Sequence, residues 1–240
     1  MSEPRSHGVH SVRLVWLFDV DGTLLLTEGA SREAFSWALR EHLGVENDLK
    51  SIRFDGRTEP LILADILVAH GARMTGAEEA EFWRVALERM RALLVPPRGY
   101  MLAGIPELLE SIDREPGWVL GLLTGNMTEM AGIKLDRFGL RQRFAFGTFG
   151  EEAADRDGLA RIAVARAAER YGVPPRRCVV VGDTENDIAC ARAAGARVVA
   201  VATGRHKLTD LAPHAPDLLL ESVTDPTPLL KWGREIAAGA

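Results

Sequence analysis

Short apolar runs that alternate with helical patterns constrain the fold of this chain more than any other feature. Runs with the length and aliphatic character of buried parallel strands occur at residues 12–18, 118–123, 178–181 and 198–201, with a weaker one at 144–146. Helical patterns occur at residues 107–112, 127–138, 159–171 and 186–194, and a glycine follows each of the last three. The alternation predicts an α/β fold with a doubly wound parallel sheet.

One block of the chain, from about residue 31 to residue 94, contains only helical patterns. Its apolar stripes follow Ser31, Thr58 and Thr75, which are residue types favoured at helix N-termini, and Thr75 forms a capping box with Glu78. The block therefore predicts several helices and no strand.

Glycine and proline mark both ends of this helical block, at residues 28–29 and 95–99, and such segments are typical of hinges. We therefore expect an all-helical cap at residues 28–97. It would be inserted into an α/β core formed by residues 1–27 and 98–240.

Composition and charge restrict the possible partners. The chain is 47% hydrophobic and 26% charged, with a net charge of −5, so it is unlike a disordered chain or a basic nucleic-acid-binding protein. The run at residues 12–18 is too short to span a bilayer, and the first eleven residues carry no signal-peptide pattern. We expect a cytoplasmic protein with no nucleic-acid or membrane partner, in which Cys178 and Cys190 are core residues.

The segment around Asp19 and Asp21 is the most informative for chemistry. Both carboxylates follow the first predicted strand, at the sheet edge where α/β proteins bind ligands. Two close carboxylates repel each other and need a cation or a shared proton, and oxygen ligands favour Mg²⁺. The alternative is a surface turn, since Asp21-Gly22 is a common turn dipeptide.

Two further strand ends carry polar side chains. Asp183 and Asp187 follow the strand at 178–181 and would share one face of the next helix, although helix capping is an alternative explanation for either acid. Thr124, Gly125 and Asn126 follow the strand at 118–123, where a hydroxyl and a helix N-terminus could bind phosphate. A simple turn is the alternative for this third segment.

Together, these three segments resemble the haloacid dehalogenase superfamily, specifically its phosphatase branch with a helical cap in the first insertion position. Asp-Val-Asp-Gly-Thr, Thr-Gly-Asn and Gly-Asp-Thr-Glu-Asn-Asp occur in the order and separation typical of that family, over nearly the whole chain. The resemblance implies that Asp19 is the nucleophile and Asp21 the general acid/base, and that Thr124 holds the phosphoryl group. Asp19, Asp183 and the backbone carbonyl of Asp21 would bind Mg²⁺, with Asp187 supporting its water shell.

The chain departs from the family pattern where a lysine normally precedes the last motif. Arg156 aligns best with that lysine, and Lys134, in the helix after Thr-Gly-Asn, is a second candidate for the cation. We expect a shared arrangement, with Arg156 paired to a nearby acid and Lys134 closer to the phosphate. The alternative for each is a solvated helix charge.

The predicted cap determines the substrate in relatives of this type. The loop at residues 53–58 contains Gly56 and Arg57, and Arg57 could meet a carboxylate or second phosphate on the leaving group. We therefore expect a Mg²⁺-dependent, phosphoglycolate phosphatase-like hydrolase that acts on a small phosphorylated metabolite through an aspartyl-phosphate, as a monomer or homodimer. A phosphomutase resembling β-phosphoglucomutase is the alternative, and a non-catalytic binding or regulatory protein on this fold is a third.

Overall fold

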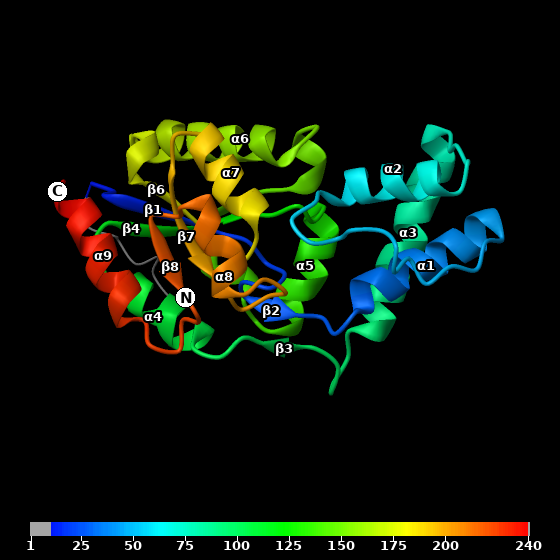
Figure 1. The fold of residues 1–240 in the computed structure, drawn as a ribbon, viewed down its shortest axis with the longest axis horizontal. Coiled ribbons are helices and arrows are strands. Elements are labelled where there is room, and N and C mark those ends of the chain that lie inside the picture. Colours follow the sequence, from blue (N-terminus) through cyan, green and yellow to red (C-terminus); the bar gives the residue numbers. More distant parts are fainter. Residues whose placement is uncertain (1–10, 240) are drawn as a thin grey trace, which may run out of the picture.

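The computed structural model describes residues 11–239 as a layered α/β body with three helices beside it (Figure 1). The part of the core prediction that concerns residues 1–10 lies outside the described residues. Helices α1–α3 lie together at one end of the molecule, and helices α4 and α6–α9 flank the sheet at the other end (Figure 1). No helix within residues 11–239 is both long and apolar enough to cross a bilayer.

The α/β body is built on a six-stranded sheet in the order β5-β4-β1-β6-β7-β8, and every neighbouring pair is parallel. The strands are β1 (Leu14–Phe18), β4 (Trp118–Leu123), β5 (Phe146–Thr148), β6 (Cys178–Gly182), β7 (Arg197–Val201) and β8 (Leu218–Leu220). Since β1 is central and the chain winds outward from it in both directions, the predicted doubly wound parallel sheet is confirmed.

Strand β1 illustrates how both faces of the sheet are covered. Trp16 and Phe18 belong to the apolar cluster under α4 and α9, whereas Val15 and Leu17 belong to the cluster under α6 and α7. All four side chains are fully buried, and truncating a buried Trp or Phe to Ala costs about 3–5 kcal/mol. The helices of this body are α4 (Ile105–Asp113), α5 (Thr128–Arg137), α6 (Arg156–Tyr171), α7 (Glu185–Ala193), α8 (Leu208–Leu211) and α9 (Thr227–Ala238).

The helical block has its own apolar core. It consists of α1 (Ala30–Leu43), α2 (Glu59–Ala69) and α3 (Gly76–Leu93), as the sequence pattern predicted. The ring of Phe35 packs edge-on at 5.7 Å from Phe82 and 5.4 Å from Trp83, and such pairs add to the stabilisation from burial. The caps at Thr58 and Thr75 form as expected, whereas α1 begins at Ala30, one residue before Ser31.

Two short strands mark where the chain passes between the two parts. β2 (Leu25–Leu26) pairs antiparallel with β3 (Tyr100–Met101), and Gly99 N–H donates to Glu28 Oε2 at 2.8 Å. The predicted boundaries at residues 28 and 97 lie close to these strands.

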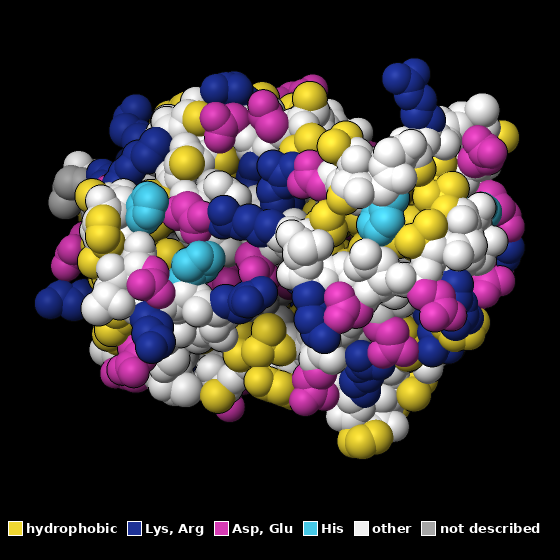
Figure 2. Space-filling view, turned by 45° about the vertical axis from the view of Figure 1, so that its right-hand side comes forward, with side chains coloured by type: hydrophobic (Ala, Val, Ile, Leu, Met, Phe, Trp, Pro, Cys, Tyr) yellow, Lys and Arg dark blue, Asp and Glu magenta, His cyan; other side chains and the backbone are white. Residues whose placement is uncertain are grey.

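Figure 2 shows basic and acidic side chains side by side across the middle of the visible face.

The sequence pattern missed some elements near the end of the chain. The weak strand predicted at 144–146 forms as β5 two residues later, and β8, α8 and α9 were not predicted. Strand β8 has three residues and is only half-buried, so it carries a weak periodic signal. Helix α9 has Pro226 at its N-cap and Pro228 in its first turn, and its buried residues Leu229, Gly233 and Ile236 do follow helical spacing, so its pattern could have been predicted. Cys178 and Cys190 are free and buried, which confirms their interpretation as core residues.

Candidate active site

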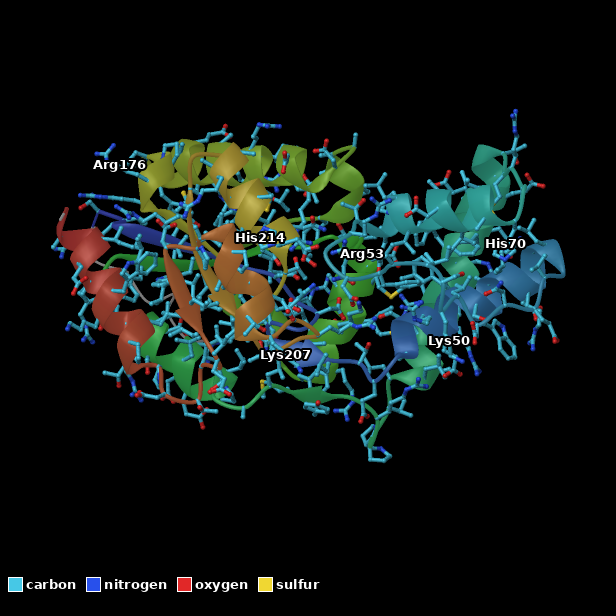
Figure 3. The ribbon with its side chains drawn as sticks, viewed as in Figure 1. Lys50, Arg53, His70, Arg176, Lys207 and His214 are labelled. Carbon is cyan, nitrogen blue, oxygen red and sulfur yellow. The ribbon has the colours of Figure 1, made fainter. Side chains whose placement is uncertain are left out.

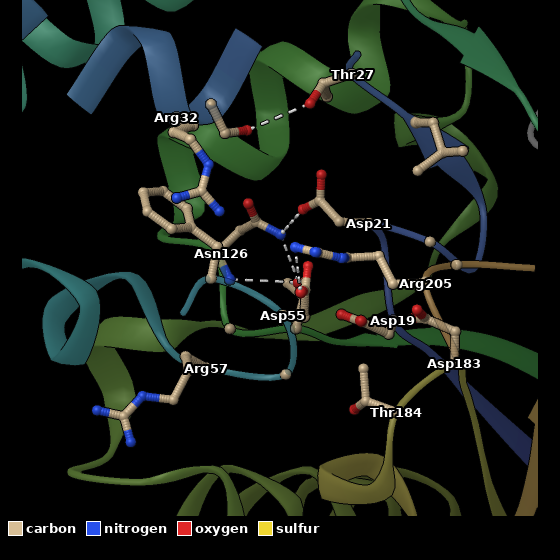
Figure 4. Close-up of a pocket in the computed structure, with 18 of the residues that line it drawn as sticks. Asp19, Asp21, Thr27, Arg32, Asp55, Arg57, Asn126, Asp183, Thr184 and Arg205 are labelled. Carbon is tan, nitrogen blue, oxygen red and sulfur yellow. Dashed lines mark hydrogen bonds and ion pairs between the residues drawn. The ribbon is translucent and has the colours of Figure 1, made fainter. Parts of the chain in front are cut away.

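The strand ends that the sequence singled out converge on one pocket. Asp19 follows β1, Thr124 follows β4 and Asp183 follows β6, and because these strands are parallel neighbours their carboxyl ends share an edge. A cavity of about 500 Å³ lies at this edge, and side chains from α1, α2 and the loop between them also line it. Figure 4 shows Asp19 beside Asp183, with Asp21 above them.

Three carboxylates lie close together at this edge of the sheet, and two of them, Asp19 and Asp183, line the pocket. Asp19, Asp183 and Asp187 each offer an oxygen, and these oxygens lie within 4.8 Å of one another. All three side chains are buried. Burial raises the pKa of Asp19 to about 6, although Arg156 opposes the shift. Burial and the neighbouring carboxylates of Asp187 and Asp19 also raise the pKa of Asp183.

Arg156 is the cation in contact with this group. It is the first residue of α6, and its Nη2 lies 3.3 Å from Asp19 Oδ1 and donates to Asp187 Oδ1. Asp187 also accepts from the Thr184 N–H at 3.0 Å and from the Thr184 hydroxyl at 2.6 Å. The predicted pairing of Arg156 with a nearby acid is what the structure shows.

The donor set fits a divalent cation. With Asp19, Asp183 and Asp187 ionised, Arg156 leaves two negative charges uncompensated in a buried site. Such a site either takes up protons, as the raised pKa values of Asp19 and Asp183 indicate, or binds a cation. Clustered carboxylate oxygens are ligands of hard divalent ions such as Mg²⁺. The cluster can therefore bind a divalent metal.

Gly22 allows these carboxylates to approach one another. Its φ of +81° lies in the left-handed region, and a Cβ at this position would lie 2.4 Å from Asp183 Oδ2. Any other residue would therefore strain the turn and push Asp183 away from β1. The hydroxyl of the next residue, Thr23, donates to Asp183 Oδ1 at 3.3 Å.

Asp21 lies on the other side of the pocket with a different set of partners. Its Oδ2 accepts from Lys134 Nζ at 2.7 Å and from Asn126 Nδ2 at 2.8 Å, and Lys134 also donates to Asn126 Oδ1. Lys134 is only 1% exposed, so it is not a solvated surface lysine. The structure thus places two buried cations in the pocket, one beside each of the two acids that follow β1.

The loop after β4 provides donors that could bind phosphate. The Thr124 hydroxyl oxygen accepts from the backbone N–H of Asn126 at 3.3 Å and from its side-chain amide at 2.7 Å, so its own O–H can still donate. A Cβ at Gly125 would lie only 2.1 Å from the backbone oxygen of Arg57. Gly125 is therefore required for the loop before α2 to lie against the loop after β4.

The loop before α2 contacts the core at several points. Gly56 O accepts from Asn186 Nδ2 at 2.8 Å, Arg53 forms an ion pair with Glu185, and Arg205 lies 3.2 Å from Asp55. Figure 3 shows Arg53 between the sheet body and the three helices α1–α3.

Arg57 was predicted to contact the leaving group, and its guanidinium lies 2.6 Å from Asp65 of α2. Figure 4 shows that this side chain points away from Asp19 and Asp183. Its partner in this structure is thus a carboxylate of the helical block.

The two charged residues of α1 and α2 that line the pocket, Arg32 and Glu59, were not recognised from the sequence. Glu59 is buried at the start of α2, where its N–H donates to Gly125 O and its Oε2 accepts from Met127 N–H, both at 2.8 Å. Burial raises the pKa of Glu59 to about 7. Arg32 lines the pocket from α1. In the sequence, Glu59 follows the N-cap residue Thr58 and resembles an ordinary acid of a first helical turn. Only the packing of α2 against the core reveals its hydrogen bonds to Gly125 and Met127.

Comparisons with known proteins agree with this geometry. A family model described as haloacid dehalogenase-like hydrolase matches residues 15–195. The phosphoglycolate phosphatase of Xanthomonas campestris pv. campestris (strain 8004) is 32% identical over 214 residues, which cover 85% of this chain and 90% of that protein. The match to the family model spans most of the chain and includes all three segments singled out from the sequence.

Solved structures show the same fold. A predicted phosphoglycolate phosphatase from Haemophilus somnus 129PT matches with a TM-score of 0.73 at 20% identity, covering 93% of this chain and all of that one. CbbY from Rhodobacter sphaeroides, solved in complex with phosphate, matches with a TM-score of 0.71 at 25% identity, covering 88% and 95% of the two chains. The chain therefore belongs to the haloacid dehalogenase-like hydrolase family, as its motifs predicted, and it is a phosphatase that hydrolyses phosphoric monoesters.

Proposed function

We propose that the enzyme is Mg²⁺-dependent and hydrolyses a small phosphomonoester through an aspartyl-phosphate formed on Asp19. The observation that carries this proposal is the grouping of Asp19, Asp183 and Asp187 around the buried Arg156 at the carboxyl edge of the sheet. A pocket of about 500 Å³ in front of these residues accommodates a small phosphorylated compound.

Mg²⁺ is the proposed cofactor. Asp19 and Asp183, with the backbone carbonyl of Asp21, would hold the ion, and Asp187 would support its water shell. When bound, Mg²⁺ offsets the repulsion between a carboxylate nucleophile and a dianionic ester and polarises the phosphoryl oxygens. The orientation of Asp187 does not depend on the ion, because Thr184 and Arg156 already bind both of its oxygens.

Asp19 and Asp21 divide the chemistry between them. A carboxylate oxygen of Asp19 attacks phosphorus, and the bond from phosphorus to the ester oxygen breaks. Asp21 gives its proton to the leaving alkoxide, then accepts a proton from the water that attacks the aspartyl-phosphate, releasing inorganic phosphate and restoring Asp19.

The hydrogen bonds of Asp21 indicate which of its atoms handles the proton. Oδ2 is held by Lys134 and Asn126, whereas Oδ1 has no hydrogen-bond partner among residues 11–239. We therefore assign the proton transfers to Oδ1. The free O–H of Thr124 and the backbone N–H of Gly125, which donates to no group among residues 11–239, would bind the phosphoryl oxygens in both steps.

The proposal is tested by release of inorganic phosphate in the presence of Mg²⁺, with phosphoglycolate, sugar phosphates, nucleotides and an aryl phosphate as substrates. Phosphoglycolate is the first choice because the Xanthomonas relative is a phosphoglycolate phosphatase. Asp19→Asn should lower kcat by about three orders of magnitude or more, and chelation should abolish turnover. The exposed Asp136→Asn is the matched control.

Acid quenching followed by mass spectrometry should also find phosphate on the peptide that contains Asp19. Substantial turnover by Asp19→Asn, or full activity in a chelator, would refute the mechanism.

A further inference from the structure

Five cationic side chains line the pocket, and they differ in whether a carboxylate neutralises them. They are Arg32, Arg57, Lys134, Arg156 and Arg205. Four of them have a carboxylate oxygen within 4.0 Å: Asp65 for Arg57, Asp21 for Lys134, Asp19 and Asp187 for Arg156, and Asp55 for Arg205. Among residues 11–239, Arg32 has no carboxylate oxygen within this distance.

Neutral groups hold the Arg32 guanidinium in place. Its Nη1 donates to the backbone oxygens of Ile52, at 3.0 Å, and of Leu49, and its flat face lies 4.3 Å from the ring centroid of Phe54. Figure 4 shows this side chain reaching from α1 toward the space above Asn126 and Asp55. Since Nη1 makes both hydrogen bonds, the other guanidinium nitrogens remain free to bind a ligand.

The backbone at Leu49 is strained at the point where it meets Arg32. Leu49 is fully buried and has a φ of +54°, a conformation that a leucine rarely adopts. Its N–H donates to the side chain of Asn47 at 2.7 Å, which supports the turn. This turn aims the Leu49 carbonyl at Arg32, and strain of this kind concentrates at functional sites.

The charges around Arg32 favour an additional anion. Burial and the neighbouring Arg205 both disfavour its charged form, and Asp55 is the largest compensating charge. Asp55 is itself in contact with Arg205, at 3.2 Å, and Asp48 adds a smaller compensating charge, but neither carboxylate is in contact with Arg32. An anionic group placed beside Arg32 would therefore gain a charge-assisted hydrogen bond without displacing an existing ion pair.

We propose that Arg32 is a specificity-determining residue that binds a second anionic group, a carboxylate or a phosphate, on the leaving group of the substrate. The proposal rests on the proposed phosphatase function. It gives the role first expected for Arg57 to a different arginine, because Arg57 already has Asp65 as its partner.

The test compares wild type, Arg32→Met and Arg57→Met on matched pairs of esters. Phosphoglycolate against 2-hydroxyethyl phosphate tests a carboxylate, and fructose 1,6-bisphosphate against fructose 6-phosphate tests a second phosphate. The readout is the ratio of kcat/KM within each pair. Wild type should prefer one anionic member by about 10- to 100-fold. Arg32→Met should lose this preference, whereas Arg57→Met should change it by less than about threefold.

A binding experiment separates failure of this proposal from failure of the phosphatase function. The same pairs are titrated calorimetrically into Asp19→Asn, with and without Arg32→Met, so that the comparison needs no turnover. Arg32→Lys, which keeps the charge but loses the planar fork, should retain part of the preference.

Absence of turnover with an Arg32-dependent preference in binding would refute only the phosphatase function. A wild-type protein with no preference in either assay, or a preference that survives in Arg32→Met, would overturn the role of Arg32.

Discussion

Arg156 and Lys134 are both buried cations of the active-site pocket, but they contact different carboxylates. Arg156 lies at the start of α6 and contacts Asp19 and Asp187, two members of the carboxylate cluster. Lys134 lies in α5 and contacts Asp21, the acid assigned to proton transfer. The two cations therefore stabilise two separate groups of atoms. The sequence predicted that Arg156 would pair with an acid, but not that Lys134 would pair with Asp21.

This difference follows from the chemistry of the two side chains. A guanidinium carries several donors in one plane and can bind two carboxylates at once, whereas an ammonium group is a compact point charge suited to a single acid. The family pattern places a lysine ahead of the last motif, and this chain has Arg156 there. We infer that two residues share the role of that lysine: Arg156 beside the carboxylate cluster and Lys134 beside Asp21. The position of Lys134 relative to bound phosphate stays a prediction.

The largest effect is expected from Arg156→Met, because it leaves three buried carboxylates without a contacting cation. We expect a loss of about 3–5 kcal/mol in the free energy of unfolding without metal and about a 10³-fold loss in kcat. Added Mg²⁺ should raise the Tm of this variant more than that of wild type. Urea unfolding, kinetics and thermal melts measure these effects.

The control for Arg156→Met is Arg161→Met, an exposed position on the same helix, which should change stability by less than about 0.5 kcal/mol. Equal Mg²⁺-induced shifts in Arg156→Met and wild type would show that Arg156 does not neutralise the metal site.

Lys134→Met should have a smaller effect, which falls mainly on the rate of the reaction. The Asp21 side chain is 39% exposed and stays hydrated, so stability should fall less than in Arg156→Met. We expect kcat to fall by about 10²-fold, the usual contribution of acid–base catalysis. The Tm shift caused by Mg²⁺ should match that of wild type, and a changed shift would place Lys134 with the metal cluster instead.

Glu59→Gln tests the carboxylate of α2 that lies near Lys134. Burial raises the pKa of Glu59 from 4.5 to about 7, so the folded protein holds this proton more tightly than the unfolded chain. Wild-type stability should therefore fall as the pH rises from about 4.5 to about 7, by about 3 kcal/mol. Glutamine resembles the protonated acid and can still accept from Met127 N–H, so the variant should escape this loss.

Urea denaturation of wild type and Glu59→Gln at pH 4.5 and pH 8 measures the effect. The variant should be the more stable protein at pH 8, and the two should be similar at pH 4.5. If the variant is no more stable at pH 8, Glu59 is not the group that titrates.

The smallest effect is expected from Gly125→Ala, which changes no charge. Its Cβ would overlap the Arg57 carbonyl and force apart the loops that Glu59 also joins. We expect kcat/KM to fall about tenfold, because imprecise positioning reduces the rate even when all catalytic groups remain. Gly76→Ala, at the start of α3, where a Cβ meets nothing within 4 Å, is a control for the glycine substitution itself. Equal effects would show that contact between the loops is unimportant.

Much of the fold was predictable because the central strands carry strong local signals. The strands at 118–123 and 178–181 appear as β4 and β6 with nearly the expected bounds. Strands β2 and β3 have two residues each, and they form only because the segments before and after the helical block lie side by side and pair. No local pattern predicts such short strands. Long-range pairing, rather than propensity, decides such elements.

The sequence by itself determined which groups stand at the carboxyl edge of the sheet. Asp19, Thr124 and Asp183 follow three strands, and parallel strands must bring such residues together. Only the tertiary structure decided which cation contacts which acid and which cap side chains reach the pocket. Arg32 and Lys134 resemble ordinary helix charges until α1 and α5 are packed against their neighbours, because burial and ion pairing are properties of surroundings drawn from distant parts of the chain.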